Sequence, residues 1–416
     1  MHILFLSDNF PPEVNAPATR TFEHARAWTR AGERVTVITG APNFPAGRVF
    51  DGYRNRLFQR ETVEGVEVRR VWSFISANEG VLARTLDYAS YMASATLAAP
   101  FVRGVDVVAA TSPQLFTACA GFLAARTLRK PFIFELRDLW PESIRAVGAM
   151  RDGRLLRGLE RLELFLYRQA AAIVSVTESF RHNLIARGVA GEKIHVVTNG
   201  ADLGRFAPRA RDAALAAELG LKGAFVVGYV GTHGMAHGLS TLLAAAERLG
   251  RTPATAHVRF LFLGDGAEKA ALVAAARAAG LSNVIFLDTV GRDQVARYWS
   301  LLDASIVHLK RTPLFETVIP SKLFECMAMG LPVLHGVRGE SADIVEREGI
   351  GLTFEPEDPE ALCRAIVRLM ADQDLRRTLA GRGPQAAQRY DRQALAACML
   401  QVLRTSAGDI HTVEAS

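Results

Sequence analysis

Short apolar runs alternate with helix-length amphipathic segments along almost the whole chain, and this alternation restricts the fold more than any other feature. The runs are apolar on both faces, as expected for strands of a parallel sheet that helices cover on both sides. Repeated strand–helix units predict an α/β protein with doubly wound sheets. The predicted strands are residues 2–7, 34–39, 66–72, 105–110, 131–136, 171–176, 194–200, 225–231, 258–264, 283–288, 304–309, 331–335 and 351–354.

The length of 416 residues suits two or three domains, each able to bury its own core. A polar stretch at 205–224, rich in alanine and arginine, interrupts the alternation and predicts a hinge. We therefore expect one Rossmann-like domain over 1–205, a second over 206–385, and a terminal amphipathic helix with a tail over 386–416. Ligands of such sheets bind beyond the carboxyl ends of the strands, so functional residues should follow the strands on both walls of a cleft between the domains.

Charge and cysteine content narrow the class of protein. The formal charge is +6, from 49 basic and 43 acidic side chains, which suits anionic partners such as phosphates or an anionic membrane face. No reading helix or aromatic-basic module indicates nucleic-acid binding. The N-terminal run is too short for a signal peptide, and no apolar run is long enough to span a membrane. The four cysteines are Cys119, Cys326, Cys363 and Cys398, and their spacing is not typical of metal or disulfide sites. We therefore expect no bound metal and a cytoplasmic location.

Two glycine-rich turns follow predicted strands in the second half of the chain. The first is GTHGMAHG at 231–238, and the second is the GDG sequence at 264–266. Such a turn before a helix presents backbone N–H groups to an anion, whereas a tight turn without a ligand is the alternative for each. The candidate phosphate-binding residues are Gly231, Thr232, His237, Gly264 and Gly266.

A lone lysine lies at the start of a predicted helix in the sequence ETVIPSKLFECMAMG (316–330). Ser321 is placed to begin the helix, and Lys322 then falls in its first turn, where a cation is electrostatically unfavourable. A bound diphosphate would remove that conflict, and Glu325 could then hydrogen-bond a ribose hydroxyl. The alternative is a surface pair between Lys322 and Glu325 at i,i+3 spacing.

Polar side chains in the first half also follow strands, where acceptor contacts are expected. The proline-rich loop 8–18 provides Glu13, and Arg20 follows it. Arg20 could instead only neutralise a neighbouring acid. Directly after the strand at 131–136 come Arg137, Asp138 and Trp140, a combination of acid and aromatic that is typical of sites for sugars or polar ligands; a helix cap is the alternative role for Asp138.

The segment 151–170 alternates leucine with arginine and glutamate at helical spacing. The simplest interpretation is an amphipathic helix packed on the sheet. Its basic face could also lie on anionic lipid, so peripheral contact with the inner face of the cytoplasmic membrane is a second hypothesis.

Motifs along almost the whole chain can be compared with those of known families. They are NFPPEVNAPATR, ELRDLWPES, VVTNGAD, GYVGTHGMAHGL, LGDGAEKAAL, PSKLFECMAMGLPVL and GLTFEPEDPEAL. Together they resemble the motifs of retaining glycosyltransferases of the GT-B, family 4 type, and the resemblance narrows to the L-fucosamine transferase-like branch that acts in O-antigen and capsule assembly. It implies two Rossmann-like domains facing a central cleft, a C-terminal helix that returns to the N-terminal domain, a nucleotide-diphosphate sugar as donor, and no metal.

Three positions depart from the family pattern. Glu325 matches the ribose-contacting glutamate of the family, but Thr317 stands where the sugar-contacting glutamate is usual, with Glu316 one position away. The usual arginine and lysine of the glycine turn are replaced by Thr232 and His237, so Lys322 would carry more of the diphosphate charge. Arg137 stands where a histidine is often found, while Asp138 fits the acidic position after it.

The resemblance implies transfer of a sugar, typically a UDP-linked N-acetylated deoxyhexose, with retention of anomeric configuration. Lys322, Asp138 and Glu316 are the predicted catalytic residues. The second domain would bind the nucleotide sugar, and the first a polyprenyl-diphosphate-linked or saccharide acceptor for surface polysaccharide synthesis. A UDP-sugar epimerase of the same fold and a non-catalytic sugar-nucleotide-binding subunit are the two alternatives.

Overall fold

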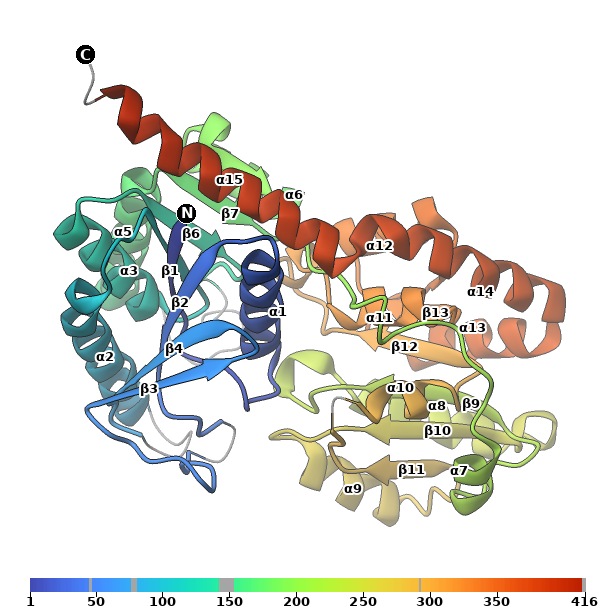
Figure 1. Ribbon diagram of the computed structural model, residues 1–416. Helices are drawn as coiled ribbons and strands as arrows, with labels where there is room; N and C mark the ends of the chain where they lie inside the picture. Colours follow the sequence, from blue (N-terminus) through green and yellow to red (C-terminus); the bar gives the residue numbers. More distant parts are fainter. Residues whose placement is uncertain (45–46, 76–80, 141, 143–152, 292, 414–416) are drawn as a thin grey trace. The chain divides into compact units, whose positions relative to one another are not determined.

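The fold is described from a computed structural model that covers residues 1–44, 47–75, 81–140, 142, 153–291 and 293–413. The chain forms two compact units: unit 1 contains Met1–Thr198 and Arg392–Ser416, and unit 2 contains Asn199–Asp391. Each unit is a mainly parallel sheet with helices on both faces, as the alternating sequence predicts (Figure 1). The stretch 205–224 lies wholly in unit 2 and contains the short helix α7 (Ala213–Glu218).

The described part of unit 1 contains an eight-stranded sheet with the order β3-β4-β2-β1-β5-β6-β7-β8. Its strands pair in parallel except β3, which pairs antiparallel with β4 at the edge. The sequence analysis missed β3 because its side chains alternate between exposed and half-buried and include few apolar residues. The strands are β1 His2–Leu6, β2 Arg34–Thr39, β3 Phe58–Val63, β4 Val66–Val71, β5 Val107–Thr111, β6 Phe132–Leu136, β7 Ala172–Ser175 and β8 Ile194–Val196.

Helices cover both faces of the unit 1 sheet. On one face, α1 and α15 pack over a core that includes Phe5, Trp28 and Met399. On the other face α3 lies between α2 and α5, and these three helices run side by side (Figure 1). The helices are α1 Ala16–Arg30, α2 Val81–Ala98, η1 Ala99–Phe101, α3 Leu115–Leu128, α5 Arg154–Gln169, α6 Glu178–Ala186, η2 Gly191–Lys193 and α15 Arg392–Val413.

The C-terminal helix α15 belongs to unit 1, which confirms that the end of the chain returns to the first domain. The indole nitrogen of Trp28 donates a hydrogen bond to the Ala396 carbonyl at 2.7 Å. Arg392 forms an ion pair with Glu23, and Arg404 forms one with Glu33. Unit 1 is therefore completed by residues from both ends of the sequence.

The described part of unit 2 contains a six-stranded parallel sheet with the order β11-β10-β9-β12-β13-β14. Alternate residues of β9 enter two separate cores: Val226 and Val230 face one, and Val227 and Tyr229 face the other. This double burial explains why the strands read as continuous apolar runs. The strands are β9 Phe225–Val230, β10 Val258–Leu263, β11 Val284–Leu287, β12 Ala304–His308, β13 Val333–Gly336 and β14 Gly351–Thr353.

Helices in unit 2 divide between the same two cores. Residues of α8, α9 and α13 enter the core that contains Tyr229, while residues of α10, α11 and α12 enter the other. The helices are η3 Met235–His237, α8 Ser240–Gly250, η4 Pro253–Thr255, α9 Lys269–Ala278, α10 Val295–Trp299, η5 Phe315–Thr317, α11 Lys322–Ala328, α12 Glu340–Glu348, α13 Pro359–Ala371, α14 Gln373–Ala387 and η6 Gln388–Tyr390.

Candidate functional site

The strand order of unit 2 reverses between β9 and β12, which lie side by side at the centre of the sheet. In doubly wound sheets such a reversal leaves a crevice at the carboxyl ends of the two strands, where ligands bind. β9 is followed by the glycine turn at 231–238, and β12 is followed by the loop that leads to α11 and Lys322. The topology therefore brings the glycine turn and the lysine to the same edge of the sheet.

The two predicted glycine turns interlock through their backbones. A Cβ atom on Gly264 would lie 2.0 Å from the Gly231 carbonyl oxygen, and one on Gly266 would lie 2.5 Å from the His233 carbonyl oxygen. Hydrogen bonds fix this contact: the His233 N–H donates to the Asp265 carbonyl, and the Glu268 N–H donates to the His233 carbonyl. Glycine is needed because both residues have positive φ, 142° and 155°, and no side chain fits. The result is a rigid platform of two adjoining turns.

Lys322 is the first residue of α11, and its amine lies over this platform. The Nζ atom is 3.5 Å from the centroid of the Tyr229 ring and 3.1 Å from the position of a Cβ on Gly231. It is buried and has no hydrogen-bond partner among the described residues. Burial lowers the pKa of Lys322 to about 7, and the Tyr229 ring offers only a cation–π contact. The buried amine is not in the surface pair with Glu325 that the spacing left open.

His237 lies beside the same aromatic ring, 5.9 Å between ring centroids. Burial, followed by the charge of Lys322, lowers the pKa of His237 to about 3, so its ring is neutral near pH 7. Its Nδ1 is 3.2 Å from the Gly234 carbonyl oxygen, which can only accept, so Nδ1 carries the proton. Nε2 is then an acceptor, and His237 could donate to a phosphate only after a bound anion has raised its pKa.

His308, at the carboxyl end of β12, supports the glycine turn from beneath. Its Nδ1 donates to the His237 carbonyl at 2.7 Å, and its Nε2 accepts from the Glu357 N–H at 3.0 Å. The ring stacks on Phe354, and a Cβ on Gly238 would lie 3.1 Å from it. The sequence analysis missed His308 and Tyr229. A polar residue that ends an otherwise apolar strand is the signal that could have identified His308.

The other predicted residues of unit 2 lie at different distances from the platform. The Thr232 carbonyl accepts a hydrogen bond from the Tyr229 hydroxyl at 2.8 Å, so Thr232 belongs to it. Ser321 is the N-cap of α11, but its side chain forms no capping hydrogen bond. Glu325 is half-buried on the following turn of the helix. Glu316 lies in η5, with its backbone carbonyl against Gly339.

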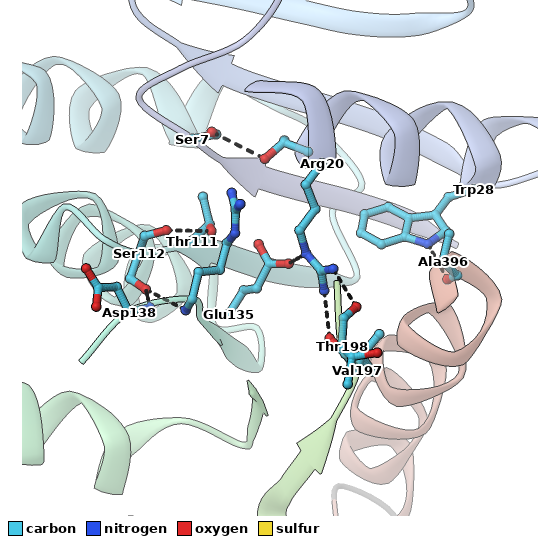
Figure 2. A network of polar contacts seen from close by, with 12 residues as sticks. Ser7, Arg20, Trp28, Thr111, Ser112, Glu135, Asp138, Val197, Thr198 and Ala396 are labelled. Atoms are coloured by element: carbon cyan, nitrogen blue, oxygen red, sulfur yellow. Dashed lines mark hydrogen bonds and ion pairs between the residues drawn. The ribbon is translucent and has the colours of Figure 1, made fainter. Parts of the chain in front are cut away.

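In unit 1 the strand order reverses between β1 and β5, and a network of polar contacts lies at the strand ends there (Figure 2). Arg20 of α1 is 4% exposed. Its guanidinium donates to Glu135 Oε1 at 2.9 Å and to the carbonyls of Val197 and Thr198 at 3.0 and 2.8 Å. Arg20 therefore joins α1, β6 and the residues after β8, which agrees with the neutralising role that the sequence left open rather than with an acceptor contact.

Glu13 also has its carboxylate directed at the protein. It is 2% exposed, and its two oxygens accept hydrogen bonds from the backbone N–H groups of Asn43, Phe44 and Phe10. The acceptor contact predicted for Glu13 is not what this geometry offers. Instead, the carboxylate holds the loop after β1 against the loop after β2.

Arg137, Asp138 and Trp140 follow β6 as predicted. Ser112 Oγ accepts from the backbone N–H groups of Arg137 at 2.8 Å and Asp138 at 3.4 Å, which sets the direction of the chain after the strand (Figure 2). The Nε and Nη1 atoms of Arg137 are buried without a hydrogen-bond partner, and burial lowers the pKa of Arg137 to about 10. The Trp140 N–H donates to the Asp138 carbonyl in a tight turn. Pro141 and Ser143 of the same motif lie outside the described residues.

Asp8 is a candidate that the sequence analysis missed. Burial, followed by the charges of Asp87 and Glu13, raises the pKa of Asp8 to about 8, and burial raises the pKa of Asp87 to about 6. A Cβ on Gly40 would lie 4.0 Å from Asp8 Oδ1 and 3.8 Å from Ser73 Oγ, so these groups surround one point at the ends of β1, β2 and β4. The signal in the sequence is that Asp8 is the first charged residue after the first buried strand.

Among the residues that the structure describes, no group of three or more His, Cys, Asp or Glu side chains is arranged to hold a metal ion. Within the same residues, none of the helices combines the length and the hydropathy needed to cross a bilayer.

Two known protein-family models match this chain, one in each half of the sequence. Residues 15–200 match the family model for a glycosyl transferase 4-like domain, and residues 224–372 match the model for glycosyl transferases group 1. The first match falls almost entirely in unit 1 and the second in unit 2.

Curated relatives extend over both units. WcaI of Escherichia coli K12, assigned as a colanic acid biosynthesis glycosyl transferase, is 27% identical over 88% of this chain and 91% of its own length. A GDP-mannose-dependent alpha-mannosyltransferase of Mycobacterium tuberculosis is 26% identical over 88% of each chain. Both relatives are glycosyltransferases by name, and both align with most of this protein.

Solved structures share the architecture. HepE of Anabaena, crystallised with UDP-glucose, superposes with a TM-score of 0.72 at 18% identity over 97% of this chain and all of its own. At this identity the likeness shows the fold alone. Together with the two family models and the two relatives, it identifies the chain as a glycosyltransferase of the group 1, GT4-like family with the GT-B fold.

Proposed function

We propose that this glycosyltransferase moves a sugar from a nucleotide-diphosphate donor to a lipid-linked or saccharide acceptor in surface polysaccharide synthesis, with retention of anomeric configuration. The observation that carries the proposal is the buried amine of Lys322, which lies on the Gly231 turn without a hydrogen-bond partner. A buried amine without a hydrogen-bond partner is costly to keep charged unless a ligand supplies one. A diphosphate bound at the platform would do so.

Departure of the nucleoside diphosphate creates negative charge at the point where Lys322 lies. Preorganised donors aimed at such charge typically contribute about 3–4 kcal/mol each to the transition state. Lys322 at the start of α11 would supply this stabilisation without a metal ion. The leaving phosphate would take the proton of the attacking hydroxyl on the same face of the sugar, so a separate protein nucleophile is not needed.

Glu316 and Asp138 have supporting roles in this proposal. Glu316 stands one position from the family's sugar-contacting glutamate and would bind donor hydroxyls, while Glu325 would bind the ribose. Asp138 follows β6 and would orient acceptor or donor hydroxyl groups. Arg137 and Trp140 would contact the acceptor beside it.

The donor nucleotide is best tested directly, because the comparisons point to two classes. The HepE structure contains UDP-glucose, whereas the mycobacterial relative uses GDP-mannose according to its name. The resemblance in the motifs favours a UDP-linked N-acetylated deoxyhexose. For the acceptor, the relation to a protein of colanic acid biosynthesis supports a growing surface polysaccharide, carried on a polyprenyl diphosphate at the inner face of the membrane.

The two alternatives, a UDP-sugar epimerase and a non-catalytic binding subunit, are not favoured by the comparisons, since the matched families and both relatives are glycosyltransferases. A non-catalytic subunit would bind the donor but show no turnover with any lipid-linked acceptor. Incubation with UDP-N-acetylglucosamine in the absence of acceptor separates the epimerase from the transferase. An epimerase would interconvert this sugar nucleotide, while a transferase leaves it largely unchanged.

A thermal-shift panel tests the proposal. Purified protein is mixed with UDP- and GDP-linked sugars and with the free nucleotides, and the panel is repeated with Lys322→Ala and with the exposed Lys222→Ala as a matched control. We expect one nucleotide class to raise the melting temperature of wild type and of Lys222→Ala but not of Lys322→Ala. Transfer by Lys322→Ala should fall about 10²–10³-fold. An unchanged shift in Lys322→Ala would contradict the assignment of the site.

A further inference from the structure

The helical layer α2–α3–α5 of unit 1, with the adjoining η1, exposes several large apolar side chains to solvent. Leu97 and Phe101 at the end of α2 are 73% and 71% exposed, and Leu155 of α5 is 66% exposed. These helices lie side by side on one face of the sheet (Figure 1). The remaining members of this exposed apolar set are Leu86, Leu123, Leu162 and Phe165.

Exposed arginines lie on or next to two of the helices that carry these apolar side chains. None of these arginines has a side-chain hydrogen bond or ion pair among the described residues, whereas exposed arginines of unit 2 such as Arg338 and Arg389 are paired with glutamates. The set on α3 and α5 is Arg126, Arg129, Arg154, Arg157, Arg161 and Arg168.

Acidic side chains of the same layer do not offset these charges at the surface. Glu163 is buried and pairs with Arg187, and Asp87 of α2 is half-buried. Glu160 is half-buried on α5, and α3 carries no acidic residue. The layer is therefore both apolar and strongly cationic.

A cavity of about 290 Å³ lies at the end of α3 and α5, next to the start of β6 and to α15. Arg126 and Lys130 line it with Gln169 and Ser406 on a base of aromatic rings. Neither cation has a hydrogen-bond or ion-pair partner among the described residues. The helix carbonyls nearby are already satisfied, because Lys193 Nζ donates to the Arg168 and Ala170 carbonyls and the Lys130 N–H donates to the Ala125 carbonyl. The two cations are therefore free to bind an anionic group.

We propose that the α2–α3–α5 layer docks on a bilayer of anionic phospholipid, and that the cavity beside it receives a lipid phosphate. The apolar side chains enter the headgroup–acyl boundary, while the arginines meet lipid phosphates. Arg126 and Lys130 bind one phosphate oxygen group, with the Gln169 amide and the Ser406 hydroxyl as neutral donors.

Charge complementarity favours this occupant over others. A second copy of the chain in a two-fold interface would place the same arginines opposite one another, where they repel. A nucleic acid offers phosphates but no apolar interior for Leu97, Phe101 and Leu155. An anionic bilayer provides both.

Vesicle co-sedimentation of the full chain, without donor or acceptor, tests the proposal. Wild type should sediment with phosphatidylglycerol-containing vesicles but not with pure phosphatidylcholine vesicles, and high salt should weaken the binding. The triple variant Arg154→Gln, Arg157→Gln, Arg161→Gln removes three exposed charges from α5. Each cation near an anionic surface changes binding roughly fivefold, so the partition coefficient should fall by about a hundredfold.

A matched control removes three exposed and unpaired arginines of unit 2: Arg209→Gln, Arg277→Gln, Arg368→Gln. It changes the net charge equally and should bind vesicles as wild type does. A second layer variant, Leu97→Gln with Leu155→Gln, should weaken binding at least tenfold while the salt dependence stays. Arg126→Gln with Lys130→Gln should also weaken vesicle binding. Inorganic phosphate added to the solution should not displace the protein from the lipid. Circular dichroism and thermal melting identify folded variants.

The proposal is overturned if wild type binds neutral and anionic vesicles equally, if the α5 triple variant sediments like wild type, or if the unit 2 control loses as much binding. If the layer instead binds a second copy of the chain, the protein would form a dimer that the layer variants abolish and that vesicles leave intact. This result would also overturn the proposal. The inference uses the proposed function only for the expectation of a lipid-linked acceptor. If the protein binds these vesicles but no nucleotide raises its melting temperature, the membrane inference stands and the proposed function fails. If a nucleotide raises the melting temperature but the vesicles are not bound, the proposed function stands and the membrane inference fails.

Discussion

At the scale of single residues, the amine of Lys322 is buried without a hydrogen-bond partner among the described residues. The sequence located it, since a cation in the first turn of a helix conflicts with the helix dipole and so indicates an anion. The Tyr229 ring beneath it and the burial of Nζ could not be deduced, because they depend on how β9 and α11 pack. For the same reason the sequence did not reveal that Glu13 and Arg20 have their polar atoms occupied inside unit 1.

The pH dependence of nucleotide binding follows from this environment. The pKa of Lys322 is lowered to about 7 in the free protein, so above pH 7 the amine is mostly neutral, and binding of a diphosphate must take up a proton. Above pH 7, where a terminal phosphate is already ionised, the affinity for UDP should fall with rising pH, by up to about tenfold per pH unit. Isothermal titration calorimetry across this range measures the slope.

Two variants test whether Lys322 causes this pH dependence. Lys322→Ala should bind more weakly and lose the slope, while Lys222→Ala should keep the wild-type slope because the Lys222 side chain is exposed to solvent. An equal slope in Lys322→Ala and wild type would show that another group takes up the proton. If UDP does not bind, the nucleotide selected by the thermal-shift panel takes its place.

At the scale of elements, the alternation of apolar runs with helix-length segments predicted most strands. The strand β2 at Arg34–Thr39 matches its predicted range at both ends. Strands buried on both faces are recognisable because their apolar character is uninterrupted. The edge strand β3 was missed because FQRETV is not a continuous apolar run: its side chains alternate between solvent-exposed and half-buried. The interlocked glycine turns were identified as turns, but their mutual contact depends on tertiary pairing of β9 with β10.

The contact between the turns yields a stability prediction. In Gly264→Ala the added Cβ would lie 2.0 Å from the Gly231 carbonyl oxygen, which cannot move without breaking the platform. Together with the positive φ at this position, this should lower the free energy of unfolding by about 3 kcal/mol and weaken nucleotide binding. Urea unfolding measures the first effect, and the thermal shift measures the second.

Gly381→Ala is the control for this substitution. Gly381 lies in α14, has open space around its Cβ position and does not have a positive φ, so alanine should be neutral or stabilising by less than about 1 kcal/mol. Gly264→Ala unfolding at the wild-type urea midpoint would mean that the two turns are not in rigid contact.

At the scale of the whole molecule, α15 couples the end of the chain to its beginning. The hydrogen bond from Trp28 to the Ala396 carbonyl and the ion pairs Arg392–Glu23 and Arg404–Glu33 all lie within unit 1. The amphipathic pattern after residue 386 predicted a terminal helix, and the family resemblance predicted its return. The register of its contacts with α1 could not be predicted, because several helical faces of unit 1 are apolar.

Truncation after Asp391 should therefore destabilise unit 1 selectively. Hydrogen exchange should lose protection in β1, β2 and α1, while β9, β10 and β12 of unit 2 keep theirs, because α15 contributes to the unit 1 core that contains Phe5 and Trp28. Removal of residues 409–416 alone leaves the named contacts in place and should have little effect. Equal loss of protection in both units would contradict the assignment of α15 to unit 1.

The division of unit 1 between both ends of the sequence also sets an order of events during synthesis. Unit 2 is one uninterrupted segment, Asn199–Asp391, so a ribosome releases everything it needs before α15 has been translated. Unit 1 must wait for the last helix to emerge before its core is closed. Unit 2 can thus fold first, as a module inserted within unit 1, whose core is complete only after α15 has been synthesised.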